Sequence, residues 1–166
     1  MVRREEGSSL GVADTLERLK LLRKPQPPDE PLRTLCHHGY LVGGLSIELD
    51  VKIDEALGPL LETMGGAALT IRVLDIRGKV FSVRLEDKQH EWEIDGLESL
   101  VETLNRGFAA WPDVKALVLL GEWEDMLQVW ALAKPVVSQL LPLDWFVPSN
   151  PAGLKAALGR GRSSSS

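Results

Sequence analysis

Residues 69–94 contain three short runs of alternating apolar and polar side chains, and this pattern constrains the fold more than any other feature of the chain. The runs are LTIRVLDI, VFSVRLE and HEWEI, and only RGK and EDKQ separate them. Strict alternation is typical of strands with one buried face, and connections this short join antiparallel strands. Residues 69–94 are therefore predicted to form a three-stranded antiparallel meander.

The next segment is predicted to be a helix over residues 97–111. Its apolar residues recur at helical spacing, and Asp95 and Glu98 are expected to cap its start. The apolar residues are Leu97, Leu100, Val101, Leu104, Phe108 and Trp111.

The rest of the body is predicted to alternate between strands and helices. VKALVLL is a continuous apolar run, which is typical of a strand buried on both faces in a parallel sheet. EWEDMLQVWALAKPVVSQLL has apolar residues on one helical face and indicates a helix that Pro135 divides. DWFV is predicted to be a last strand, and NPAGLKAALG a last helix in which Asn150 is the cap and Gly159 the end.

Before the meander, LSIELDV alternates like a strand, and residues 53–64 show helical spacing despite Gly58-Pro59. Residues 9–23 carry Leu16, Leu19 and Leu22 on a narrow stripe, so they are expected to form a short helix. Four prolines in residues 24–31 then favour an extended linker.

These elements indicate three parts of the chain. Residues 1–31 are expected to form an arm outside the main core, residues 32–158 a single α/β domain, and residues 159–166 a disordered tail. The predicted fold class is α/β of the α+β type, with a mixed sheet covered by helices, because a meander is followed by α-β-α-β-α.

This element order is similar to that of ribonuclease H-like folds over residues 69–158. The resemblance implies a nuclease site in which acidic side chains hold two divalent metals. The acids that match are Asp75, Glu98 or Glu102, and Glu122, whereas the last helix, PAGLKAAL, contains no acid. A small metal-dependent hydrolase that uses Asp75, Glu102 and Glu122 is therefore the alternative to a non-catalytic relative.

Charge is distributed unevenly along the chain, whose net charge is −5. Residues 34–150 contain 9 basic and 18 acidic side chains, a net charge of −9, while residues 151–166 add +3. Because Lys and Arg supply most of the affinity for a phosphate backbone, an acidic body argues against nucleic acid as the main partner. It favours a basic protein surface or a divalent cation.

TLCHHGYLVGG, residues 34–44, contains the single cysteine and two of the three histidines. On an extended segment Cys36 and His38 would face the same side, and His90 is the only other histidine, so these three residues are the candidate zinc ligands. A second close pair of ligands is missing, which favours a buried cysteine beside two polar residues. No metal or other cofactor is expected.

Other sequence patterns bear on where the protein lies in the cell. No apolar run is long enough to cross a bilayer, and the first residues do not form a signal peptide's apolar core, so a cytoplasmic protein without a membrane segment is expected. The phosphate-binding, nucleophile-elbow and zinc-protease motifs are absent from the sequence.

The sequence therefore favours a non-enzymatic interaction or adaptor module that binds another protein or itself. Its expected binding residues are the leucine stripe of the arm, the acidic and aromatic lip of Glu122, Trp123 and Glu124, and Trp145 as an edge anchor.

Overall fold

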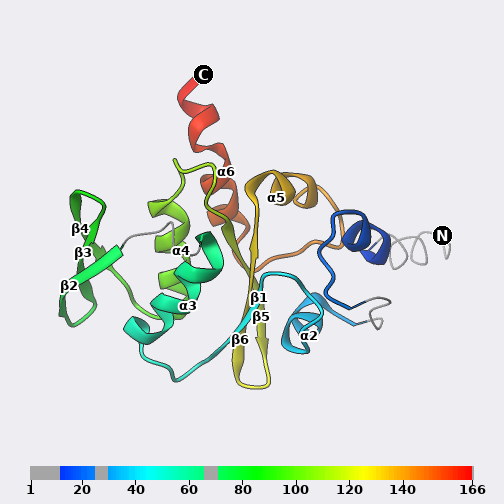
Figure 1. Cartoon of the computed structure of the whole chain (residues 1–166), viewed down its shortest axis with the longest axis horizontal. Coiled ribbons are helices and arrows are strands. Elements are labelled where there is room, and N and C mark those ends of the chain that lie inside the picture. The colour runs from blue at the N-terminus through cyan, green and yellow to red at the C-terminus, as the bar shows by residue number, and fades with distance from the viewer. Residues whose placement is uncertain (1–11, 25–29, 66–70, 166) are drawn as a thin grey trace.

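The computed structural model describes residues 12–24, 30–65 and 71–165, with side chains described to residue 158. This part of the chain contains two separate three-stranded sheets, and all of their strand pairs are antiparallel. Figure 1 shows the layers, in which helices lie between the two sheets and further helices cover the far face of the sheet that contains β1, β5 and β6. The predicted α+β class is confirmed.

The first sheet has the strand order β1-β6-β5, and its strands are β1 (Gly44–Glu48), β6 (Met126–Leu132) and β5 (Ala116–Trp123). The central strand β6 is buried along almost its whole length. Its Leu127 and Val129 belong to one hydrophobic core, and its Trp130 belongs to a second. The first sheet is therefore covered on both faces.

The second sheet is the predicted meander. Its order is β2-β3-β4, and its strands are β2 (Ile71–Arg77), β3 (Val80–Leu85) and β4 (Lys88–Glu93). The alternating residues Phe81, Val83 and Leu85 are buried, whereas the residues between them face outward. This one-sided burial follows from the period of two along a strand.

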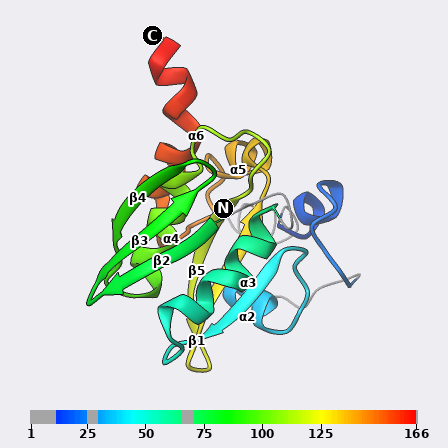
Figure 2. The ribbon, with the colours of Figure 1, turned by 60° about the vertical axis from the view of Figure 1, so that its left-hand side comes forward.

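Two helices lie between the sheets, as Figure 2 also shows: α3 (Ile53–Gly65) and α4 (Leu97–Gly107). In α4, Leu100, Val101 and Leu104 are completely buried and contact the first core, which includes residues of both sheets. Helix α3 contains Pro59 without ending there. Because α4 contributes to a core shared with both sheets, it joins them into one body.

The opposite face of the first sheet is covered by the helix of residues 12–18 and by α2 (Leu32–His37), α5 (Lys134–Leu140) and α6 (Pro151–Ser165). Leu16 is completely buried in this second core, and Leu19 and Leu22 pack against it. Leu22 also pairs with Leu41. The sequence had led us to expect an arm outside the main core, but the described part of the arm is packed on the domain.

The outer edge of β5 has no strand partner, and two buried asparagine side chains bond to it instead. The N–H of Leu117 donates to Asn105 Oδ1 (2.8 Å), and Asn105 Nδ2 donates to the Leu117 carbonyl (3.0 Å). The N–H of Leu119 donates to Asn150 Oδ1 (3.0 Å), and Asn150 Nδ2 also donates to the Leu117 carbonyl (3.0 Å). A side-chain amide has both donors and an acceptor, so it can replace a neighbouring strand.

The segment after β5 is a strand, and the predicted helix EWEDMLQVWALAKPVVSQLL was wrong over its first half. Glu124 and Asp125 form a two-residue turn with φ of 56° and 60°, the left-handed values that tight hairpins require. Helix α5 begins only at Lys134, with Pro135 in its first turn. The predicted parallel strand is therefore half of an antiparallel hairpin.

Four further predictions differ from the structure. DWFV forms a turn and an irregular segment rather than a strand. Helix α6 continues past Gly159, and α4 has Gly96 at its N-cap without a side-chain capping bond from Asp95. The element order that resembled ribonuclease H-like folds is not observed, because β6 replaces a helix and the strands form two sheets instead of one mixed sheet.

The asparagine bonds to β5 predict a specific loss of stability. Replacing Asn105 with Ala leaves the buried N–H of Leu117 without its acceptor, and a buried donor left unpaired costs about 1–3 kcal/mol. We expect Asn105→Ala to lower the free energy of unfolding in urea by that amount. Gln89→Ala, at an exposed position of β4, serves as the control and should change it by less than about 0.5 kcal/mol. Equal effects of the two substitutions would contradict this role of Asn105.

Candidate functional site

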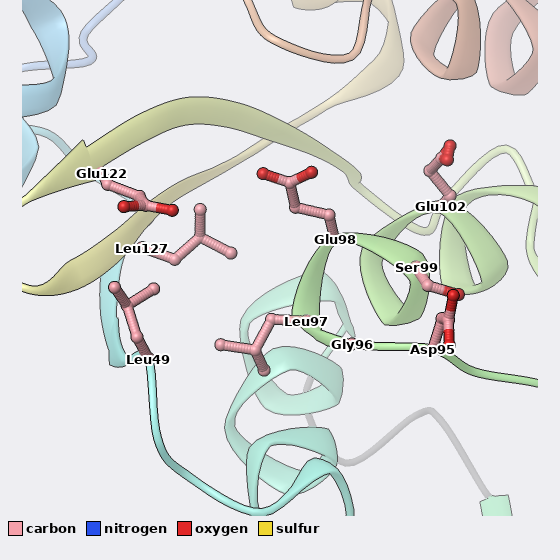
Figure 3. A pocket seen from close by; sticks show the side chains of 9 residues that line it. All are labelled: Leu49, Asp95, Gly96, Leu97, Glu98, Ser99, Glu102, Glu122 and Leu127. Carbon is pink, nitrogen blue, oxygen red and sulfur yellow. The ribbon is translucent and has the colours of Figure 1, made fainter. Parts of the chain in front are cut away.

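A hollow of about 460 Å³ opens between the start of α4 and the β5–β6 hairpin. Figure 3 shows Glu98 of α4 and Glu122 of β5 pointing toward the same opening from opposite sides. Three leucines lie below these carboxylates. The residues that line the hollow are Leu49, Asp95, Gly96, Leu97, Glu98, Ser99, Glu102, Glu122 and Leu127.

A β-bulge in β5 directs Glu122 into this hollow. The register shifts between Leu119 and Gly121. Gly121 has a backbone φ of 114°, a value that residues other than glycine rarely adopt. Because the bulge adds one residue, it reverses which face the following side chains occupy. Glu122 therefore lies opposite Leu127, on the face of the first core, and Trp123 lies on the other face.

A second hollow, of about 540 Å³, lies at the tip of the same hairpin. Leu49 lines both hollows and is 41% exposed, so an apolar side chain lies where the two adjoin. The Leu49 N–H donates to the Asp125 carbonyl (3.3 Å), which holds the loop after β1 against the hairpin. The second hollow is lined by Glu48, Leu49, Asp50, Glu124, Asp125 and Met126.

All ionisable side chains that line the two hollows are acidic. Among the described residues, the one ion pair that reaches them joins Asp95 to Lys79 of the β2–β3 turn (2.6 Å). The hydrogen bond from Lys79 to Asp95 and the attraction between their charges raise the pKa of Lys79. The acids Glu98, Glu102, Glu122 and Glu124 are exposed and have no described cationic partner. We call the two hollows together the acidic surface.

The fold partly assembles the predicted hydrolase residues. Glu102 and Glu122 line the same hollow, but Asp75 is on β2 in the second sheet, where Arg77 pairs with it at 2.8 Å. Within the described ranges, no group of three or more His, Cys, Asp or Glu side chains has an arrangement that fits a metal ion. The structure therefore does not bring the three acids together.

The predicted lip of Glu122, Trp123 and Glu124 is divided between two faces of the hairpin. Glu122 and Glu124 contribute to the acidic surface. The Trp123 ring lies on the other face, where the guanidinium of Arg33 from α2 is 5.5 Å from its centroid. An arginine of the chain itself therefore contacts the aromatic side chain that was expected to attract an arginine of a partner.

The three candidate zinc ligands lie in two parts of the fold, two of them at α2 and one on β4. Cys36 is buried in α2, His38 follows that helix, and His90 lies on β4, where its ring is 6.3 Å from that of Trp92. The Cys36 thiol is within hydrogen-bonding distance of the carbonyls of Leu45 (3.8 Å) and Val129 (3.6 Å). Cys36 thus packs α2 on the first sheet.

Trp145 lies near the second core, and its ring is 6.3 Å from that of Phe146 at an interplanar angle of 87°. It is partly buried and does not lie on a strand, so its role as an interface anchor stays a prediction. Sequence reasoning missed Leu49, Asp95 and Ser99 as lining residues. The alternation in LSIELDV, which directs Glu48 and Asp50 outward, was the one available signal for the second hollow.

No protein-family model, curated protein or solved structure matches this chain. Among the residues that the structure describes, no helix is both long and apolar enough to cross a membrane.

The environment of Cys36 predicts how stability changes at alkaline pH. Burial raises the pKa of the thiol to about 11, although the two carbonyl contacts partly oppose this shift. The unfolded chain loses the thiol proton near the ordinary value of 9.0, whereas the folded chain keeps it until about 11. Stability from the protonated thiol is therefore complete below pH 9 and decreases as the pH rises toward 11, by about 2–3 kcal/mol in total.

This effect is measured as the difference between wild type and Cys36→Ser, because serine keeps a hydroxyl donor but does not ionise in this range. We expect the wild-type free energy of unfolding to fall more steeply than that of Cys36→Ser above pH 9. Parallel curves for the two proteins would show that the thiol is not buried as described.

Proposed function

We propose that this chain is a non-enzymatic protein-interaction module whose acidic surface binds a basic, partly apolar segment of a partner protein. The observation that carries the proposal is the composition of the two adjacent hollows. Acids line both, leucines lie below Glu98 and Glu122 in the first, and Leu49 and Met126 are the apolar residues of the second. A cationic side chain with a long aliphatic stem matches both features, since its stem contacts leucine while its charge stays near carboxylates.

The chemistry of the surface favours binding over catalysis. The rim acids are exposed to water, and Glu98 lies in the first turn of α4, where the helix dipole stabilises a negative charge. Exposed carboxylates in these surroundings can attract a cationic side chain. Negative charge on this surface also repels a phosphate backbone, and the single cysteine is compatible with a cytoplasmic location.

We expect a partner segment to bind across both hollows. Leu49 lies between the hollows, so an extended segment that places cationic side chains in each of them would pass over this leucine. Exposed ion pairs contribute about 0.2–1 kcal/mol each, and salt weakens them. We therefore expect affinity to arise from several such pairs together with contact at Leu49.

The test uses a short fluorescent peptide that alternates arginine and leucine, and fluorescence anisotropy as the measurement. Removing two carboxylates with Glu98→Gln and Glu122→Gln should weaken binding about fivefold to tenfold. A matched control with Glu62→Gln and Glu91→Gln removes the same charge from exposed acids outside both hollows and should retain most of the affinity.

A second peptide with glutamate in place of arginine checks the sign of the charge and should not bind. If the control variant weakens binding as much as the double variant of the hollow, the site assignment is wrong. Absence of binding by wild type at low salt would contradict the proposed function itself.

A further inference from the structure

We infer that a second copy of this chain is a partner of the acidic surface, and that it binds through the basic turn formed by residues 18–24. This inference rests on the proposed function, because it names a partner for the same surface. It follows from a charge complementarity within the chain itself, between the basic turn and the acidic surface.

The basic turn is the most strongly basic feature among the described residues. Its sequence, RLKLLRK, contains four cations and no acid, and all four cations are exposed. The four cations are Arg18, Lys20, Arg23 and Lys24. Because the rest of the body carries an excess of acids, this turn stands out as a localised positive patch.

The backbone of the turn is fixed on the domain. Leu21 is 7% exposed, and its carbonyl accepts a bond from the Val42 N–H (2.8 Å). The Arg23 N–H donates to the Tyr40 carbonyl (2.7 Å). A partner that binds this turn therefore orders only side chains, and this reduces the entropy lost on association.

Within the described part of the chain, no acid of the same copy neutralises the charges of the turn. Among the described residues, none of the four cations forms an ion pair within 4.0 Å. The Lys24 Nζ atom donates to the His38 carbonyl (3.2 Å) and lies 4.8 Å from the centroid of the Tyr40 ring. Arg23 Nε donates to the Leu41 carbonyl (3.3 Å). Carbonyl and ring contacts orient these two side chains but leave their net charge in place.

The basic turn and the acidic surface belong to opposite sides of the first sheet. Leu21 and Leu22 of the turn pack with the second core, whereas Leu97 and Leu127 below the acids belong to the first. The turn therefore does not bind the acidic surface of its own copy. The two surfaces differ, so copies associate head to tail, and such contacts produce a ring or an open chain.

A charge exchange tests the inference by sedimentation velocity on the full-length chain at several concentrations. One variant replaces two of the four acids of the first hollow with Glu98→Lys and Glu122→Lys. The other replaces two of the four cations of the turn with Arg18→Glu and Lys20→Glu, so the net charge of the altered surface becomes zero in each variant. Wild type should associate at about 0.05 M salt and dissociate at about 0.5 M salt, where charges are screened over a shorter distance. Each variant alone should associate at least about tenfold more weakly.

An equimolar mixture of the two variants should associate again, because the hollow variant retains the basic turn and the turn variant retains the acidic surface. The pair Glu62→Lys and Glu91→Lys controls for net charge and should associate like wild type, apart from a small general effect. If a reversed variant does not keep the wild-type circular dichroism spectrum, the neutral pair Glu98→Gln and Glu122→Gln replaces it and should weaken association.

The outcomes separate this inference from the proposed function. A wild-type chain that binds the arginine and leucine peptide but stays monomeric at low salt would overturn the inference alone. Association that both reversed variants retain would also overturn it, since another surface would then be responsible. Loss of peptide binding together with loss of self-association in the hollow variant supports both.

Discussion

The position of β5 at the edge of the first sheet is the constraint on which the other elements depend. An edge strand leaves N–H and C=O groups without partners. Each such group that is buried and unpaired lowers the free energy of unfolding, and several of them together would cost more than the small net stability of a domain. Asn105 and Asn150 bond to these groups from α4 and from the residue before α6. The same bonds therefore satisfy the strand and fix two helices, and through α4 they orient the second sheet.

The sequence predicted the secondary structure correctly for elements with one buried face, and it predicted the wrong element for β6, in which both faces are buried. The meander alternates with a period of two, and α4 has a single apolar stripe, so each pattern had one interpretation. In β6 apolar residues occupy both faces, and Trp123, Met126, Leu127 and Trp130 also fit a helical stripe. The Glu124-Asp125 turn contains no glycine, although both residues adopt left-handed φ values, so the usual hairpin signal was missing.

The acidic surface could be predicted only in its composition. Net charge indicated an acidic body, and Glu122 and Glu102 were candidates, but their neighbours come from segments far apart in the chain. Whether Glu122 or Trp123 would face the first core depended on a one-residue bulge, which a sequence of apolar residues does not reveal. The bulge directs the carboxylate into the hollow and turns the indole toward Arg33.

The N-terminal segment shows why the two charged surfaces occur together. Its leucine stripe was expected to bind a partner, but Leu16 is buried in the second core, so the apolar face of the segment is used in folding. The cationic side chains of the basic turn stay exposed on one side of the first sheet, and the acids that line the hollow lie on the other side. In the proposed association we expect attraction between these surfaces to be mainly electrostatic, because Leu49 is the one exposed large apolar side chain among the described residues that line the hollows. We therefore expect ionic strength, more than burial of apolar area, to determine the affinity of the proposed cationic partner.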